Sequence, residues 1–138
     1  MNQTNLIDAL AYIEANFDKT VSLAQLATLS ALSVSRFATV FRQQVGLSPY
    51  RYICELRVRR AQTLLLAGVP GSVVASEVGF FDQSHLARHF KRFCGMTPSA
   101  FVERARDKAR SAERDAGLRK RFVQTGPRLF AFDDAHVA

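Results

Sequence analysis

Apolar residues near the start of the chain recur with the spacing of an amphipathic helix. Leu6, Leu10, Ile13 and Phe17 follow one another at steps of four, three and four residues, so they share one helical face. The alternation of apolar and polar residues that marks a half-buried strand is absent, and we therefore expect no β-sheet.

Two serines mark the starts of the next two helices. Ser22 and Gln25 form a capping box, in which the serine hydroxyl accepts from the third backbone N–H and the glutamine side chain reaches back. This helix is expected to run only to about Leu29, because Ser33 is a second N-cap. The apolar face after Ser33 consists of Phe37, Val40, Phe41 and Val45. The pattern predicts two short helices joined by a tight turn.

A long joining helix is predicted next, from about Pro49 to Leu66. Gly46 can end the preceding helix in the left-handed conformation, and Ser48 supplies an N-cap with Pro49 at the first helical position. At 1.5 Å per residue, this helix would extend on the order of 26 Å. Its expected buried positions are Ile53, Leu56, Ala61, Leu64 and Leu65.

The same order of elements then occurs a second time. After the break at residues 68–71, Ser72 is predicted to cap a short helix that runs to about Val78, and Asp82 is predicted to cap another. The apolar stripe of this last helix consists of Leu86, Phe90 and Phe93.

An internal repeat of 49 residues relates the two passes. It lays residues 32–33 on 81–82, residues 37–38 on 86–87, and Gly-Leu-Ser-Pro at 46–49 on Gly-Met-Thr-Pro at 95–98. A short helix, a turn and a second helix with a polar outer face is the order of a helix-turn-helix. The second helix can enter a major groove, about 12 Å wide, because its inner face is anchored in a core. We predict an all-α protein of about seven helices, with two helix-turn-helix subdomains joined by the long helix.

This organisation divides the chain into four segments. They are residues 1–48 with the first helix-turn-helix, 49–66 with the joining helix, 67–106 with the second helix-turn-helix and a closing helix, and 107–138 as a C-terminal extension. The extension stays open to two interpretations: it prolongs the last helix and folds back, or it is disordered. Its basic cluster at residues 119–121 either lengthens a DNA footprint or keeps the end soluble.

Composition and charge narrow the class of partner. A chain of 138 residues, 48% hydrophobic and 22% charged, suits one compact domain or two very small ones. The net charge of +7 favours a polyanionic partner, nucleic acid before an acidic membrane surface. Residues 51–106 concentrate this charge, with 9 basic and 4 acidic side chains. No apolar stretch approaches the length of a membrane span and no secretory signal is present, so we expect a cytoplasmic protein.

The chain offers little for catalysis or metal binding. Cys54 and Cys94 are too few for a disulfide framework. His85 and His89 have a spacing that can chelate a metal, but the glutamate of a zinc-protease motif is missing. No phosphate loop, nucleophile elbow or carboxylate pair stands out. We expect no enzyme activity, no cofactor, no metal and no small-molecule site.

The segment from Gly79 to Phe93, followed by residues 95–101, resembles the AraC/XylS family of bacterial transcription regulators. The resemblance covers about residues 6–104 and includes both repeats. It implies an all-helical domain that binds double-stranded DNA and regulates promoters, usually as an activator that contacts RNA polymerase.

The resemblance also assigns base-reading positions. In the second unit they are Gln83, Ser84, His85 and Arg88, and in the first unit they are Ser35, Arg36, Ala38 and Thr39. Arginine can bond bidentately to guanine and glutamine to adenine, whereas Ala38 and Thr39 cannot make such pairs. We therefore expect stricter readout by the second unit. Candidate phosphate contacts are Lys91, Arg92, Arg42, Arg57 and Arg60.

Phe81 stands where the family commonly has serine, and we expect it to pack in the turn rather than to contact a thymine methyl group. Two rival functions stay open: a helical adaptor for an acidic protein and a nonspecific DNA-compacting protein. An adaptor has no need for two capped reading helices 49 residues apart, and a compacting protein has no need for Gln83 and Arg88 on an exposed helical face. Whether the chain is a complete small regulator or the DNA-binding part of a longer protein also stays open.

Overall fold

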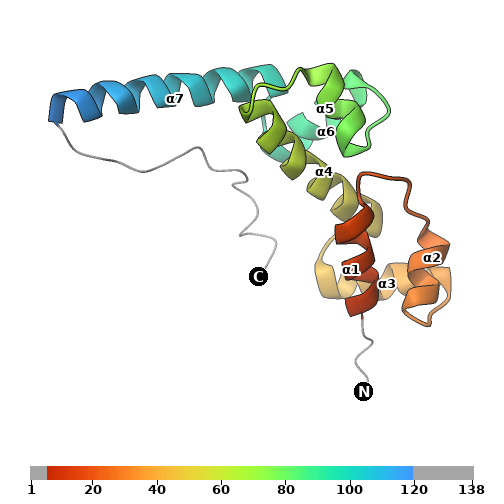
Figure 1. Cartoon of the computed structure of the whole chain (residues 1–138). Helices are drawn as coiled ribbons and strands as arrows, with labels where there is room; N and C mark the ends of the chain where they lie inside the picture. The colour runs from red at the N-terminus through yellow and green to blue at the C-terminus, as the bar shows by residue number, and fades with distance from the viewer. Residues whose placement is uncertain (1–5, 120–138) are drawn as a thin grey trace.

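The computed structural model describes residues 6–119, and within them it contains helices and no strand. The helices are α1 (Ile7–Asn16), α2 (Leu23–Leu29), α3 (Val34–Val45), α4 (Pro49–Leu66), α5 (Gly71–Val78), α6 (Gln83–Cys94) and α7 (Pro98–Arg119). Figure 1 shows α4 joining two helix groups while α7 projects to one side. The predicted all-α class is confirmed. Within the described residues no single helix is long and apolar enough to span a membrane. Only α2 and α3 taken together reach that length and composition, and they are bent by 79° at their junction.

Side chains cap four of the helices as the sequence predicts. In each case the cap oxygen accepts from the backbone N–H three residues later, over 2.8 to 3.3 Å, and the caps are Ser22, Ser33, Ser48 and Asp82. The second half of the capping box is wrong. Gln25 does not reach back, because its Oε1 accepts from the Tyr12 hydroxyl of α1 at 3.2 Å. This bond ties α2 to α1.

The predicted cap of α5 is also wrong. The helix begins at Gly71, and its N-cap is Pro70, which has no side-chain cap bond. Pro70 is extended, with φ −60° and ψ 146°, and its ring fixes φ. The backbone therefore turns into the helix before Ser72, which lies inside the first turn.

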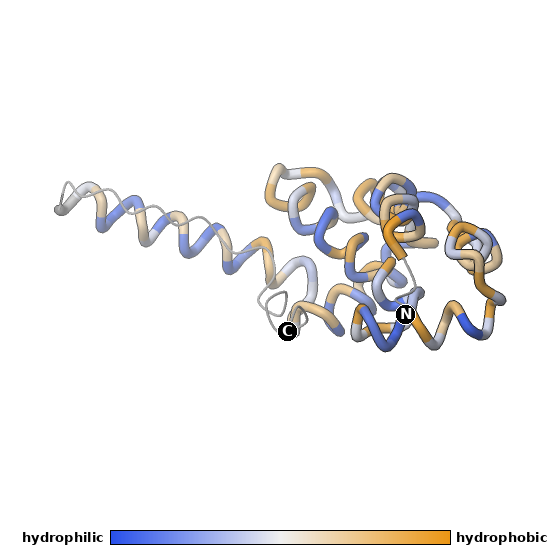
Figure 2. The backbone as a smooth tube through the Cα atoms, turned by 90° about the horizontal axis from the view of Figure 1, so that it is seen from below, coloured by the Kyte–Doolittle hydropathy of each residue, from blue (hydrophilic) through white to orange (hydrophobic). Residues whose placement is uncertain are grey.

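Two hydrophobic cores lie at opposite ends of α4. The first core joins α1, α2 and α3 around Phe37 and Phe41, and the second joins α5, α6 and α7 around Leu86 and Phe90; all four side chains are fully buried. α4 serves both, with Ile53 in the first core and a run of apolar side chains in the second, namely Cys54, Val58, Ala61 and Leu65. Figure 2 shows the alternation of hydrophobic and hydrophilic positions along the helices.

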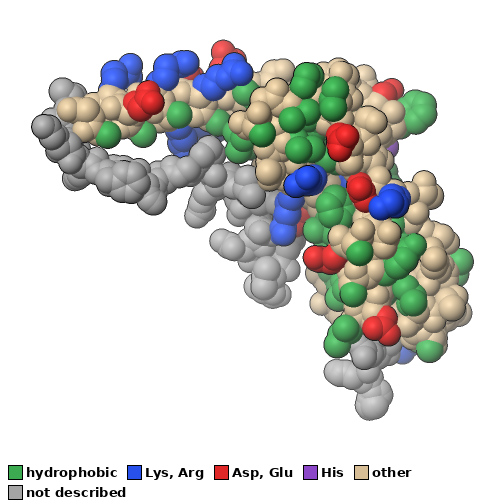
Figure 3. All heavy atoms as spheres, in the orientation of Figure 1, with side chains coloured by type: hydrophobic (Ala, Val, Ile, Leu, Met, Phe, Trp, Pro, Cys, Tyr) green, Lys and Arg blue, Asp and Glu red, His purple; other side chains and the backbone are tan. Residues whose placement is uncertain are grey.

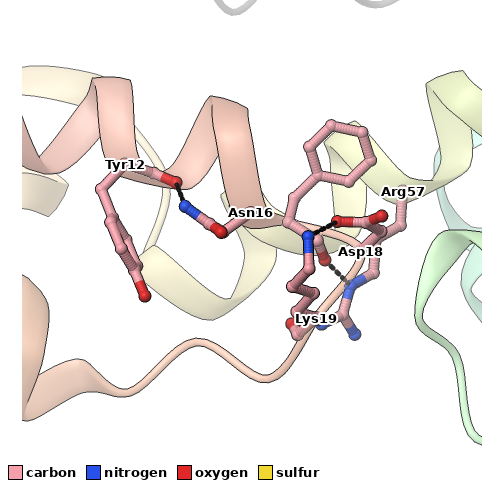
Figure 4. A network of polar contacts seen from close by, with 6 residues as sticks. Tyr12, Asn16, Asp18, Lys19 and Arg57 are labelled. Carbon is pink, nitrogen blue, oxygen red and sulfur yellow. Dashed lines mark hydrogen bonds and ion pairs between the residues drawn. The ribbon is translucent and has the colours of Figure 1, made fainter.

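Arg57 of α4 connects the two subdomains. Its Nε donates to the carbonyl oxygen of Phe17 at 2.7 Å, and its Nη2 donates to that of Lys19 at 3.0 Å, both in the loop after α1 (Figure 4). Its guanidinium also lies 5.6 Å from the ring centroid of Phe80, which follows α5. We call these contacts the Arg57 bracket.

Gly79, which ends α5, completes the bracket by allowing a close approach. It has φ +97°, and a Cβ placed on it would lie 2.8 Å from the Asp18 carbonyl oxygen and 3.1 Å from Arg57 Nε. The loop after α1 therefore lies directly against the turn between α5 and α6. This contact joins the two helix-turn-helix subdomains directly, in addition to the connection through α4.

α7 packs on the second core only through its first turns. Phe101 and Ala105 are buried, and the Phe101 ring meets that of Phe90 at 5.4 Å between centroids. Between residues 106 and 117 most side chains are exposed, and Lys and Arg side chains line this projecting part (Figure 3). Residues 107–119 thus prolong the last helix. The predictions for the side chains of the basic cluster at 119–121 and for residues 122–138 fall outside what the structure describes.

The two cysteines are free thiols in the interior of the second subdomain. Cys54 is fully buried, and Cys94 is half-buried with its Sγ 3.2 Å from Gln62 Nε2. Burial raises the pKa of Cys94 to about 12 and also raises that of Cys54. Both side chains therefore stay protonated and act as small apolar groups in the packing.

Candidate nucleic-acid interface

The first two turns of α6 present the second set of predicted base-reading residues. Gln83, Ser84 and Arg88 are exposed, and His85 is half-buried. Ser84, His85 and Arg88 are spaced by three and four residues, so they share one side of the helix. Leu86 and Phe90 anchor the opposite side of the helix in the second core. The arrangement leaves polar groups on the surface of a helix that cannot rotate.

A cluster of rings holds α6 in place. The His89 ring stacks on that of Phe80, with centroids 5.2 Å apart and planes 10° apart, and meets the Tyr50 ring edge-on at 5.9 Å. The Tyr50 hydroxyl lies 3.5 Å from His89 Nε2. His85 and His89 pack ring against ring at 4.8 Å. Residues 6–119 contain no group of three or more side chains able to hold a metal ion.

His89 gives this cluster a pH dependence. Burial, followed by the electrostatic interaction with His85 and then with Arg88, Arg92 and Arg57, lowers the pKa of His89 from 6.5 to about 4. The unfolded chain binds the proton near pH 6.5, whereas the folded protein resists it until about pH 4. The unfolded state therefore binds more protons between these values, and the free energy of unfolding falls as the pH falls.

We expect this loss of stability in urea unfolding measured between pH 7 and pH 5. The His89→Gln variant, which carries no titrating group at this position, should lose less stability over the same range. Equal pH dependence in both proteins would show that His89 is not the group responsible.

α3 presents the first set with fewer polar groups. Ser35, Arg36 and Thr39 are exposed, and Ala38 is half-buried. The Thr39 hydroxyl donates to the carbonyl oxygen of Ser35 at 3.2 Å, one turn earlier in the same helix. Arg36 is therefore the only long side-chain donor among these four positions.

The residues predicted to contact phosphate differ in their surroundings. Arg42, Arg60, Lys91 and Arg92 are exposed, and neither α3 nor α6 contains an acidic residue. Arg57 is instead half-buried, with Nε and Nη2 engaged by the carbonyls of the bracket. We therefore assign Arg57 to holding the subdomains together and leave it out of the candidate phosphate contacts.

The expected packing of Phe81 in the turn is wrong. Its side chain is 89% exposed, the largest exposure among the large hydrophobic residues described, whereas its neighbour Phe80 is 4% exposed. Phe80 occupies the inward position between Arg57 and the histidine rings, and its neighbour Phe81 faces outward. The Phe81 ring stands beside the start of α6.

Two contributors to the site were missed by sequence reasoning. A Cβ on Gly71 would lie 2.6 Å from Gln83 Nε2, so the missing side chain gives the Gln83 amide its position. Tyr50 links the start of α4 to α6 across 39 residues. In the sequence Gly71 signals only a helix break, and nothing local marks Tyr50.

Comparisons with known proteins agree with this geometry. Residues 26–104 match the family described as a helix-turn-helix domain. The arabinose operon regulatory protein of Escherichia coli K12 is 37% identical over 89 residues, which are 64% of this chain and 29% of that protein. The chain spans less than half the length of the curated relatives it matches first.

Two solved structures share the fold and more than a quarter of the aligned residues. The DNA-binding domain of AdpA, a global transcriptional factor solved in complex with a target DNA, has a TM-score of 0.66 at 27% identity, covering 77% of this chain and 96% of that one. A probable AraC family transcriptional regulator from Rhodopseudomonas palustris has a TM-score of 0.65 at 27% identity, covering 72% and 95%.

Proposed function

Because the chain belongs to the AraC/XylS family of helix-turn-helix regulators, we propose that it binds double-stranded DNA sequence-specifically and regulates transcription. One observation carries the proposal: α3 and α6 are two capped helices with buried inner faces, exposed polar outer faces and no acidic residue. Such helices can lie in successive major grooves, with phosphates of either strand close to their basic side chains.

The two helices have unequal roles in this proposal. In α6, Gln83, Ser84, His85 and Arg88 contact base edges, while Lys91 and Arg92 contact phosphate. In α3, Arg36 makes the principal base contact, beside Ser35, Ala38 and Thr39. Arg42 of α3 and Arg60 of α4 contact phosphate. The half-site facing α6 is therefore the more strictly specified, since it receives the bidentate donors.

Salt-sensitive binding by one protein copy is the expected behaviour. We expect a monomer to bind a duplex site of roughly 20 base pairs that spans two major grooves. Its affinity should fall with salt by about 0.9 logarithmic units per tenfold increase for each phosphate neutralised. Titration of a fluorescent duplex at several salt concentrations measures the salt dependence of the affinity, and analytical ultracentrifugation measures the number of protein copies per site. Salt-independent affinity, or two copies on the minimal site, would contradict the proposal.

Selection from a random duplex pool separates this function from its rivals. Enrichment of one bipartite sequence supports a regulator. Retention of duplexes without enrichment would indicate a DNA-compacting protein, and no retention would indicate a protein adaptor. We further propose that the DNA-bound protein activates transcription through RNA polymerase, which transcription in vitro from a promoter carrying the selected site would test.

A further inference from the structure

Phe81 has an exposed ring and lies immediately before Asp82, the N-cap of α6. The Phe81 side chain is 89% exposed and so obtains little of the apolar burial that its neighbour Phe80 has. A single exposed apolar side chain is common on protein surfaces and calls for no partner by itself. A second observation, at His85, gives this one a chemical meaning.

The backbone N–H of Phe81 selects the tautomer of the neutral His85 ring. The Phe81 N–H donates to His85 Nδ1 at 3.2 Å, so Nδ1 carries a lone pair and the proton of the neutral ring is on Nε2. The Asp82 carboxylate accepts from the His85 backbone N–H at 2.8 Å, which fixes the residue at the third position after the cap. The ring also packs edge-on against Phe80 at 5.1 Å and against His89. His85 is therefore an oriented hydrogen-bond donor.

Among residues 6–119 no recorded hydrogen bond uses His85 Nε2. The start of α6 thus offers a donor from His85 and an exposed apolar ring from Phe81, four residues apart and joined by one hydrogen bond. Any ligand that satisfies both must carry an acceptor next to an apolar group.

In the major groove only thymine has this pair of features. Thymine presents the O4 acceptor and the C5-methyl group on one edge; guanine has acceptors without a methyl group, cytosine has a donor, and adenine has an acceptor and a donor. We propose that Phe81 and His85 together read one thymine in the half-site facing α6, with the ring on the methyl group and Nε2–H on O4. The proposal rests on the proposed function, because it requires α6 in a major groove.

Atomic substitutions in the DNA separate the two contacts. After the preferred site is selected, each thymine facing α6 is replaced singly by deoxyuridine, which lacks only the methyl group. At one position we expect wild-type affinity to fall about fourfold, the factor expected when one buried methyl group is lost. Replacing the same thymine·adenine pair by 5-methylcytosine·guanine keeps the methyl group but exchanges O4 for an amino donor, and should also weaken binding.

Protein variants then assign each contact to its residue. Phe81→Ser keeps the backbone N–H that orients His85, and it should bind the thymine and deoxyuridine sites equally. His85→Gln can accept as well as donate, so it should discriminate less between thymine and 5-methylcytosine. Ile7→Ser, at a 67% exposed position on α1, is the control and should keep the wild-type ratios. Melting temperatures check that each variant is folded.

The outcomes distinguish this inference from the function on which it rests. Absence of any selected sequence would refute the proposed function itself. Sequence-specific binding in which no thymine facing α6 responds to deoxyuridine would overturn the inference alone. It would also be overturned if Phe81→Ser kept the fourfold effect, or if that variant weakened binding to all sequences equally, since Phe81 would then act as a general contact.

Discussion

Replacement of Gly79 by alanine is expected to destabilise the protein by about 2 to 4 kcal/mol. The left-handed backbone at φ +97° costs an alanine about 1 to 2 kcal/mol. The remainder comes from the new Cβ, which would lie 2.8 Å from the backbone oxygen of Asp18, an atom that can move only with its whole loop. The free energy of unfolding in urea measures the loss.

Gly68→Ala is the matched control for this prediction. Gly68 has a similar φ of +91°, but a Cβ placed there meets nothing within 4 Å. The Gly68→Ala variant should therefore lose only the free energy that the left-handed backbone costs an alanine, with no contribution from a steric clash. Equal losses in the two variants would mean that the approach of Asp18 to Gly79 contributes nothing.

The same substitution should change which DNA sites are bound. The Arg57 bracket holds α3 and α6 in one relative orientation, and Gly79 is part of it. If the bracket opens, the distance between the two half-sites becomes less strictly specified. Affinity measured on sites with one base pair added or removed between the half-sites should therefore vary less for Gly79→Ala than for the wild type.

Arg88→Ala is expected to cost about 1 to 3 kcal/mol of binding free energy on the preferred site and to relax the preference at one or two base pairs. Arg88 is exposed on the polar side of α6 beside Ser84 and His85, where a guanidinium fork could reach a guanine edge in the proposed complex. Binding titrations on the selected site and on its single-base variants measure both effects.

Arg92→Ala provides the comparison from the same helix. A phosphate contact carries no sequence information, so this variant should weaken binding to every sequence alike and reduce the salt slope by about one unit. If Arg88→Ala instead lost equal affinity on all sequences, Arg88 would be a phosphate contact. A stricter half-site facing Ser35 and Arg36 would contradict the expected asymmetry.

The helix order could be predicted because helix ends depend on residues close in sequence. A cap such as Ser33 or Asp82 needs only the backbone N–H three residues later. Ser72 shows the limit of this signal, since the fixed backbone of Pro70 starts the helix before the serine can serve. Gln25 shows another, because a tyrosine on α1 competes for its side chain.

The exposed polar faces of α3 and α6 could also be predicted, as the side opposite each apolar stripe. The bracket could not, because Arg57 binds carbonyl oxygens 38 and 40 residues away, and every residue carries such an oxygen. Nor could the sequence pattern show which of the two adjacent phenylalanines, Phe80 or Phe81, would be buried. Phe80 fills the space beside Arg57, and that choice alone exposes Phe81.

The protonated thiols of Cys54 and Cys94 make the native chain suitable for site-directed labelling. Alkylating reagents attack the thiolate, and a pKa raised to about 12 leaves almost none at Cys94 near neutral pH. Cys54 is enclosed completely and its pKa is raised as well. A cysteine introduced on the exposed outer half of α7 would therefore react first. A dye attached there would report the approach of DNA without removal of either native cysteine.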